Sequence, residues 1–386
     1  MRILYSHRTR SADGQRVHID GLTRALVAAG HEVLMCGPEG ISTPDTPVEL
    51  ATGKTGGAKA RLPGPVYELA EWAYSLPAAR RLKAAAERFE PDVIYERYNL
   101  YFHAASRIAP SLGLPFLLEV NSPLVDERLA TGALALENFA RRSEKTLWNA
   151  ADAVLPVTGV LGDIIKAQGV PENRIHVVPN GVDAAALTET DGHELRAAYE
   201  IREPIVLGFV GFVREWHGVD RVVDWLAGET GSSAHLLLVG DGPVASDLKA
   251  QASRLGVADR LTITGVVQRH EVAAHIAAFD IALQPAVTAY ASPLKLQEYM
   301  AQSRAIIAPD QANIREAVTH GETALLVSPG DTTALHNALT TLATDQALRE
   351  GLGKAARQTL LERDMTWAAN ARRVVEIAQN LILARH

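Results

Sequence analysis

The chain has 386 residues, of which 47% are hydrophobic and 22% charged, with a formal net charge of -7 and one cysteine. This length predicts two domains, each large enough to bury its own core. The acidic balance argues against a nucleic-acid partner, and the lone Cys36 excludes an internal disulfide and a cysteine zinc site. No apolar run reaches the ~18 residues that cross a bilayer, and the N-terminal run is too short for a signal peptide. We therefore expect a cytoplasmic protein, either soluble or peripheral at the inner face of the membrane.

In the first half of the chain, short β-rich runs alternate with longer helical runs. The predicted strands are residues 3–5, 32–35, 92–95, 115–120 and 153–157, and the clearest helices are residues 17–29, 77–89 and 134–149. The first of these helices ends at Gly30, a favoured C-cap residue. Residues 51–65 are rich in Gly, Lys and Pro without periodicity, and we interpret them as a mobile loop.

The same alternation restarts after the turn signal Pro179-Asn180-Gly181. The second series of predicted strands is residues 205–210, 236–239, 261–264, 281–284 and 305–308, and a last helix covers residues 366–383. Strand and helix alternation of this kind is typical of a parallel, doubly wound sheet. The sequence thus predicts an α/β protein of two Rossmann-like halves.

In such sheets ligands bind beyond the carboxyl ends of the strands, so the loops that follow strands carry the candidate site residues. Gly211 permits close backbone approach, and Arg214 and His217 could face a phosphate at the next helix start. A plain turn with a solvated Arg and His explains the segment equally well. Gly240 and Gly242 suit a tight turn near a ligand, but such turns are also common for structural reasons. No GxGxxG fingerprint follows a predicted strand, which disfavours an NAD enzyme.

The loop after residues 281–284 gives the strongest signal. Ser292 is a candidate N-cap with Pro293 at the first helical position. Lys295 then falls in the first turn, where a cation opposes the helix dipole unless an anion binds there. A diphosphate would remove this conflict, and Glu298, one turn further, is at a distance suited to ribose hydroxyls. A capped helix with a surface Lys and Glu is the structural alternative.

These segments resemble the family 4 retaining glycosyltransferases of GT-B fold. The stretches that carry the resemblance are PNGVD at 179–183, WHG at 216–218, GDGP at 240–243, SPLKLQEYMA at 292–301, PD at 309–310, NIRE at 313–316 and GETALLV at 321–327. The resemblance runs from about residue 178 to 370, and the first half is similar more loosely through GHEV at 30–33 and through Gly14.

The resemblance implies a GT-B fold, with two Rossmann-like doubly wound domains facing across a cleft. The N-terminal acceptor domain would comprise residues 1–178 with a helix at 368–386 crossing back to it, and the donor domain residues 179–367. The implied activity is a retaining, metal-independent transfer of a sugar from a nucleotide-diphosphate sugar (UDP- or GDP-linked) to a glycan, lipid-linked or small-molecule acceptor. No cofactor is implied.

The family's diphosphate contacts map onto Arg214 and Lys295, which become the catalytic candidates, with His217 where a Lys is commoner. Glu298 matches the second acid of the family's E-x7-E motif and resembles a ribose contact. The first acid of that motif falls at Tyr290 and is missing, which puts the usual sugar contact in doubt. The other donor-side candidates are the backbone of residues 291–294 including Ser292, Pro293 and Leu294, then Val266 and Val267 at the base, Gly14 near the donor phosphates, and Gly211, Gly240 and Gly242 in loops near the ligand.

On the acceptor side, Glu96 and Arg97 follow one predicted strand, and Glu119 and Asn121 follow another. Both pairs are expected at the carboxyl edge of the first sheet. For Glu119 a structural role in a buried polar cluster is an equal alternative.

Two other functions stay open. A nucleotide-sugar epimerase of the same fold would share the donor pocket, and a non-catalytic nucleotide-sugar-binding protein would fit the loss of the acid at Tyr290. Separately, the helix at 77–89 pairs basic residues with apolar ones and could touch an anionic membrane, although a solvated surface helix is the simpler interpretation. The basic residues of this helix are Arg80, Arg81, Lys83 and Arg88, and its apolar residues include Leu82, Ala86 and Phe89.

Overall fold

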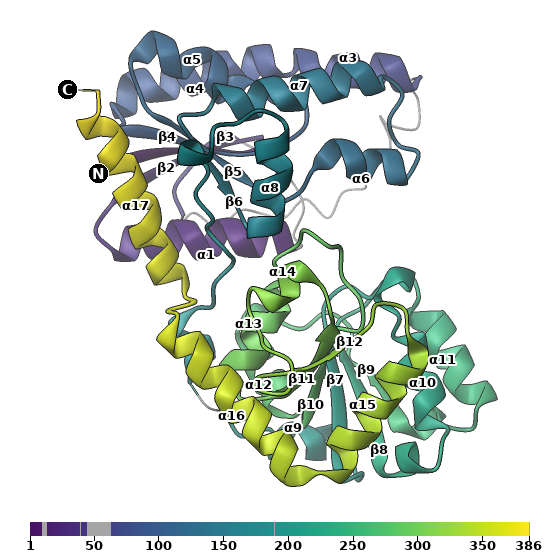
Figure 1. Cartoon of the computed structure of the whole chain (residues 1–386). Coiled ribbons are helices and arrows are strands. Elements are labelled where there is room, and N and C mark those ends of the chain that lie inside the picture. Colours follow the sequence, from purple (N-terminus) through teal and green to yellow (C-terminus); the bar gives the residue numbers. More distant parts are fainter. Residues whose placement is uncertain (10–13, 39, 45–62, 189, 386) are drawn as a thin grey trace. The chain divides into compact units, whose positions relative to one another are not determined.

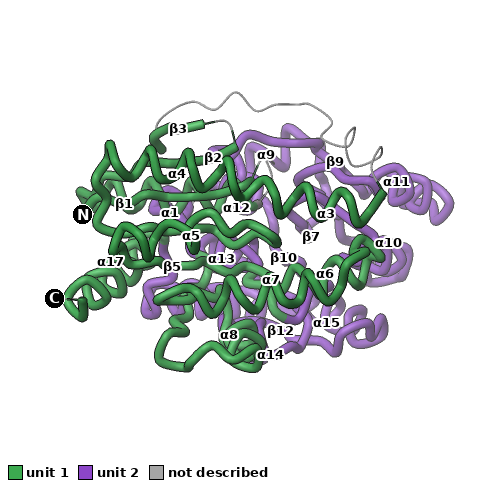
Figure 2. Tube along the Cα trace, turned by 90° about the horizontal axis from the view of Figure 1, so that it is seen from above, with its two compact units in different colours: residues 1–180, 290–292, 367–386 green, residues 181–289, 293–366 purple. Residues whose placement is uncertain are grey.

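The computed structural model describes residues 1–9, 14–38, 40–44, 63–188 and 190–385 (Figure 1). The chain divides into two compact units, which Figure 2 shows in different colours. Unit 1 consists of Met1–Asn180, Tyr290–Ser292 and Trp367–His386, and unit 2 of Gly181–Ala289 and Pro293–Thr366. Among the described residues, no helix combines the length and the apolar character that crossing a membrane requires.

Unit 1 is built on a six-stranded sheet with the order β3-β2-β1-β4-β5-β6. Its strands are β1 (Arg2–Ser6), β2 (Glu32–Gly37), β3 (Gly40–Ser42), β4 (Val93–Arg97), β5 (Phe116–Val120) and β6 (Ala153–Pro156). All neighbours pair in parallel except β2 and β3. The five strands predicted for this half are confirmed within two residues at each end, and β3 was missed because three residues carry no readable alternation.

The helices of unit 1 cover both faces of its sheet, with α3, α4, α5 and α7 on one side and α1 on the other (Figure 1). Their bounds are α1 (Gly14–Ala28), α3 (Gly64–Ala73), α4 (Ser75–Phe89), α5 (Ala104–Leu112), α6 (Leu124–Ala130), α7 (Glu137–Ala150), α8 (Gly159–Ala167) and α17 (Trp367–Leu383). Of the loop predicted at 51–65, residues 51–62 lie outside the described residues. Its last two residues open helix α3, where Pro at the first turn sets the helical φ.

The last helix, α17, packs along α1 within unit 1. The close approach depends on Gly21, because a Cβ at this position would overlap the indole of Trp367. Trp367 also meets the His18 ring edge-on, with the ring centroids 4.9 Å apart. Helix α17 therefore returns the chain to unit 1, and its close contact with α1 requires glycine at position 21.

Unit 2 holds a fully parallel sheet with the order β12-β11-β10-β7-β8-β9. Its strands are β7 (Ile205–Val210), β8 (Ala234–Val239), β9 (Leu261–Ile263), β10 (Ile281–Leu283), β11 (Ala305–Pro309) and β12 (Leu325–Val327). Its helices are α9 (His193–Ala198), α10 (Asp220–Leu226), α11 (Ala245–Arg254), α12 (Val272–Ala277), α13 (Leu294–Ala301), α14 (Ala312–Arg315), α15 (Thr332–Thr344) and α16 (Gln346–Glu362). The predicted α/β class is confirmed, since both units are Rossmann-like.

In each sheet the strand order reverses once, and this reversal marks the edge where ligands can bind. In unit 1 the strand order reverses between β1 and β4, and in unit 2 between β7 and β10. The carboxyl edge beside such a reversal is the usual ligand crevice of an open α/β sheet. The two ends of unit 2 also lie together, because Val182 N donates to Met365 O at 3.1 Å.

Candidate functional site

The carboxyl edge of unit 2 brings Lys295 next to the loop that follows β7. As predicted, Lys295 lies in the first turn of α13. Its Nζ sits 3.8 Å from the centroid of the Phe209 ring, and a Cβ added to Gly211 would lie 3.6 Å from that Nζ. Phe209 belongs to β7 and α13 follows β10, so the ammonium stands at the strand reversal.

The predicted cap of this helix is wrong in detail. Helix α13 begins at Leu294, and its N-cap residue is Pro293 with no side-chain cap hydrogen bond. Ser292 instead groups with unit 1, where its Oγ accepts from Asn180 N at 3.3 Å. The extended Pro293 is therefore the cap residue, and Ser292 lies one residue before it.

Burial lowers the pKa of Lys295 to about 7, and the nearby Glu298 offsets this only in part. Desolvation disfavours the charged ammonium, and the positive end of the helix dipole acts in the same direction. A bound anion would reverse both effects. This lysine is therefore electrostatically poised for an anionic ligand.

Arg214 and His217 lie together in the loop after β7. Arg214 is exposed, with its guanidinium carbon 5.3 Å from the Phe212 ring centroid. His217 is buried, and its Nδ1 accepts from Arg214 N at 3.0 Å. Burial, followed by the charges of Lys295 and Arg214, lowers the pKa of His217 to about 3. His217 is thus neutral at physiological pH and fixes the loop. The family more commonly has a lysine at this position, and His217 does not supply the positive charge of that lysine.

Close backbone packing explains why two of the candidate positions are glycine. A Cβ at Gly240 would overlap Gly211 O, and one at Gly242 would overlap Val213 O. Gly211 and Gly240 also adopt φ values of +124° and +137°, which L side chains rarely take. These glycines let the loops after β7 and β8 pack together, and this sets the position of Arg214.

Glu298 pairs with a residue to which the sequence assigned no role. Arg269 Nη1 donates to Glu298 Oε1, and Arg269 Nη2 lies 3.8 Å from Asp183 Oδ2. Glu298 is buried, so any ribose contact would share its carboxylate with this guanidinium. No local pattern signals Arg269, because it lies 29 residues before its partner.

Three large apolar side chains are exposed in the loops that follow the strands of unit 2. Val266 is 84% exposed, and Phe212 and Trp216 are about half exposed. Val267 is partly buried against the core. A base contact at Val266 stays a prediction, and its exposure leaves room for a planar ligand.

Tyr290 occupies the place of the missing acid and groups with unit 1. Its carbonyl accepts from Thr158 Oγ1 at 2.8 Å, and its hydroxyl donates to Glu127 Oε1. A carboxylate therefore does lie beside this position, on Glu127. The sequence could not indicate it, since the two residues are 163 positions apart.

In unit 1 the acceptor-side candidates form a buried polar cluster around Glu119. Arg97 and Asn121 donate to its Oε1, Tyr95 and Tyr5 donate to its Oε2 at 2.9 and 3.3 Å, and His18 Nδ1 lies 3.3 Å from Oε1. Burial raises the pKa of Glu119, but its charged and hydrogen-bonding neighbours lower it below the usual value. Because so many donors occupy this carboxylate, the structural alternative fits Glu119 best.

Glu96 is also buried, at the end of β4. Its Oε2 accepts from Ser6 Oγ at 2.9 Å and from Ala105 N at 3.1 Å. Burial raises the pKa of Glu96 to about 8, so the group is mostly protonated at neutral pH. Of Gly14 only its place as the first residue of α1 is described, and residues 10–13 before it lie outside the described residues.

Comparison with known proteins decides the family. Residues 12–186 match the family described as Glycosyltransferase Family 4, and residues 204–345 match Glycosyl transferases group 1. The chain belongs to glycosyltransferase family 4. This glycosyltransferase is 26% identical to the alpha-D-kanosaminyltransferase of Streptomyces kanamyceticus, over 66% of this chain and 67% of that one.

The fold of this glycosyltransferase is shared by solved structures. Sucrose-phosphate synthase from Thermosynechococcus elongatus superposes with a TM-score of 0.76 at 22% identity, over the whole of both chains. Anabaena HepE in complex with UDP-glucose gives a TM-score of 0.75 at 18% identity, over 98% of this chain and all of the other. The predicted GT-B fold and nucleotide-sugar-dependent transfer are confirmed.

Proposed function

We propose that this glycosyltransferase takes its sugar from a UDP- or GDP-sugar and holds the diphosphate with Lys295 and Arg214. The observation that carries the proposal is that both cations lie near His217, at the strand reversal of unit 2. Within the described part of the chain, neither forms an ion pair. Two uncompensated cations at such an edge suit a ligand with two linked phosphates. The UDP-glucose complex of HepE supports this choice of donor.

The proposed transfer retains the anomeric configuration and needs no metal ion. The acceptor hydroxyl oxygen bonds to the anomeric carbon while the bond from that carbon to the diphosphate oxygen breaks. The departing phosphate takes the hydroxyl proton. Lys295 and Arg214 stabilise the charge that develops on the diphosphate, because they are held in place before the reaction.

The remaining donor contacts follow from the same edge. Glu298 accepts hydrogen bonds from the ribose hydroxyls, and Arg269 holds its carboxylate in position. Val266 contacts the base, and the backbone of residues 291–294 contacts the sugar.

The acceptor is a glycan, a lipid-linked sugar or a small molecule, and we place the enzyme in the cytoplasm. The membrane contact predicted for residues 77–89 needs a different surface. Leu82 and Ala86 are buried in the core of unit 1, so the apolar face of α4 is not available to a bilayer.

A calorimetric screen tests this function. The purified protein is titrated with UDP, GDP, ADP, TDP and their glucose or mannose conjugates, with and without EDTA. We expect one nucleotide to bind equally well in both conditions, with slow hydrolysis of its sugar conjugate. Failure of every nucleotide to bind would refute the proposal, and binding abolished by EDTA would refute metal independence.

The product of that screen separates the alternatives. Binding with neither hydrolysis nor transfer would indicate the non-catalytic protein that the loss of the acid at Tyr290 suggests. Conversion of the donor sugar into its epimer without an acceptor would indicate the epimerase.

A further inference from the structure

The outer face of helix α3 and the start of α4 is apolar and exposed. Between residues 63 and 80 no acidic side chain is exposed, and the first exposed charge is Arg80. Val66 and Leu69 are 49% exposed and Leu76 is 44% exposed. The exposed positions in this stretch are Pro63, Gly64, Pro65, Val66, Leu69, Ala70, Ala73, Leu76, Pro77 and Arg80. We call Val66, Leu69, Ala70 and Ala73 of α3, together with Leu76 at the start of α4, the α3 stripe, because helical spacing places the four α3 residues on one side of that helix.

The acids of α3 point the other way. Glu68 is buried and accepts from Tyr101 OH at 2.6 Å. Glu71 is buried and forms ion pairs with Arg128 and Arg8. A helix on an aqueous surface normally shows the reverse pattern, with apolar residues inside and charges outside. The inverted pattern indicates that the outer face meets an apolar phase.

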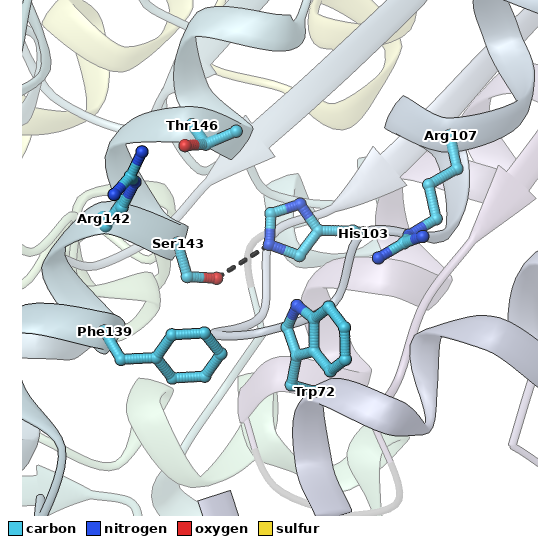
Figure 3. A pocket seen from close by; sticks show the side chains of 7 residues that line it. All are labelled: Trp72, His103, Arg107, Phe139, Arg142, Ser143 and Thr146. Carbon is cyan, nitrogen blue, oxygen red and sulfur yellow. Dashed lines mark hydrogen bonds between the residues drawn. The ribbon is translucent and has the colours of Figure 1, made fainter. Parts of the chain in front are cut away.

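A cationic pocket borders the same helix. It has a volume of about 240 Å³ and lies between α3, α5 and α7 (Figure 3). Its lining residues are Trp72, His103, Arg107, Phe139, Arg142, Ser143 and Thr146. Figure 3 shows His103 in the middle of this set, with its Nε2 2.7 Å from Ser143 Oγ. No carboxylate is among the lining residues in the described part of the chain.

The charge of the pocket comes from Arg107 and Arg142. Both are exposed, and among the described residues neither has an ion-pair partner. Arg107 lies 5.5 Å from the centroid of the Trp72 ring. Burial and Arg107 lower the pKa of His103 to about 4, so this ring stays neutral. Two unpaired guanidinium groups suit a phosphate, which they can bind in bidentate fashion.

Trp72 joins the two features. On α3 it follows Leu69 by three residues and precedes Leu76 by four, and its ring packs edge-on against Phe139 in the pocket with a centroid distance of 6.2 Å. Tryptophan favours the boundary between acyl chains and headgroups, where one side of the ring is apolar and the other wet. Arg80, Lys83 and Arg88 are exposed along α4 beyond the stripe, where Lys83 pairs with the exposed Glu87.

We propose that this face of unit 1 docks on a membrane containing anionic phospholipids, with the α3 stripe in the acyl region and a headgroup phosphate between Arg107 and Arg142. The surface is distinct from the donor site and does not depend on the proposed donor chemistry. It also replaces α4 as the apolar element of the membrane contact that the sequence suggested. The alternative occupants of the stripe and pocket are a second copy of the chain and a soluble phosphate compound.

Vesicle sedimentation of the full chain tests the proposal. We expect binding to vesicles of phosphatidylcholine with 25% phosphatidylglycerol, and at least tenfold weaker binding to phosphatidylcholine alone. The double variants Leu69→Ser/Leu76→Ser and Arg107→Gln/Arg142→Gln should each weaken binding at least tenfold. The matched controls Leu255→Ser/Leu361→Ser and Arg254→Gln, at exposed positions of unit 2, should bind as the parent does.

Three kinds of result would overturn the docking proposal. One is no sedimentation of the parent with anionic vesicles, or equal sedimentation of all variants. Another is a dimer in solution that Leu69→Ser/Leu76→Ser dissociates, which would identify a second copy as the occupant. The third is binding of inorganic phosphate or glucose 1-phosphate, lost in Arg107→Gln/Arg142→Gln, without vesicle binding. Melting temperatures unchanged in both double variants would show that they are folded.

Discussion

The carboxyl edges of the two sheets carry charged groups of opposite character. In unit 1, Glu119 is buried and surrounded by donors from Tyr5, Tyr95, Arg97 and Asn121. In unit 2, Lys295 has no ion pair within the described part of the chain, and its pKa is lowered to about 7. Lys295 lies beside the strand reversal of unit 2, and Glu119 on β5 bonds to residues of β1 and β4, the strands at the reversal of unit 1, so position alone does not distinguish them.

The contrast between Glu119 and Lys295 shows how a structural charge differs from a ligand-binding charge at the end of a strand. A buried charge that its own chain compensates stabilises the fold, because its hydrogen bonds are made before any ligand arrives. A charge left uncompensated lowers the stability of the free protein and gains most when a ligand of opposite sign binds. The comparison predicts a stability defect from changes at Glu119 and a binding defect from changes at Lys295.

The largest effect is expected for Glu119→Ala, which tests whether Glu119 stabilises the fold. Removing one member of a buried charged cluster costs about 3–5 kcal/mol, so we expect the melting temperature to fall by about 10 °C. Scanning calorimetry measures it, with the exposed Asp191→Ala as control. An unchanged melting temperature together with lost transfer would show instead that Glu119 binds the acceptor.

The counterpart in unit 2 is Lys295→Ala. Loss of a charge-assisted contact to the diphosphate should weaken nucleotide binding about 100-fold. The melting temperature of the free protein should stay constant or rise, since a half-buried cation is removed. Lys249→Ala, an exposed lysine of α11, serves as the matched control in the same calorimetric titration. Equal nucleotide affinity in the two variants would place the diphosphate elsewhere.

Titration with pH sharpens the assignment of Lys295. Since the pKa of Lys295 is near 7 in the free protein, a bound diphosphate should raise this pKa, and Lys295 should take up a proton on binding. Nucleotide affinity should therefore fall above pH 7, by up to about tenfold per pH unit. Calorimetry in buffers of different ionisation enthalpy measures the uptake. Lys295→Arg should abolish the uptake and keep part of the affinity, and uptake that persists in this variant would contradict the assignment.

Glu298 stands between the two classes, because Arg269 compensates it while its predicted role is ligand contact. We expect Glu298→Gln to weaken binding of UDP about tenfold and to weaken binding of its 2′-deoxy analogue less, since that analogue keeps only one of the two ribose hydroxyls. Calorimetry of both ligands measures this. A fall in melting temperature with unchanged affinity for both would place Glu298 with Glu119 as a structural acid.

The smallest effect is expected at Glu96. Its folded pKa of about 8 lies above the usual carboxyl value, so the folded state binds the extra proton between these values and stability falls as pH rises through them. Glu96→Gln mimics the protonated acid and should raise the melting temperature by a few degrees at pH 8 but hardly at pH 5. A gain of equal size at both pH values would contradict the protonated state.

The sequence predicts the fold well because its signals are local. Buried strands such as β7 are continuous apolar runs, and α13 was placed with Lys295 in its first turn. The site was only partly predictable, because compensation of charge is a long-range property. Neither the Arg269 partner of Glu298 nor the Glu127 partner of Tyr290 leaves a local pattern. His217 was assigned by its place in a motif, and burial, which makes it neutral, cannot be inferred from spacing.

The pairing of Val182 with Met365 and Thr366 ties together the two ends of unit 2. Apart from Tyr290–Ser292, unit 2 is one continuous stretch of chain that begins and finishes at the same point. In genetic terms it is a cassette inserted into unit 1, and segments with adjacent ends are those that tolerate excision and exchange. Recombination at positions 181 and 366 would therefore exchange unit 2, which we propose binds the donor, between relatives without reconnecting a single strand of either sheet.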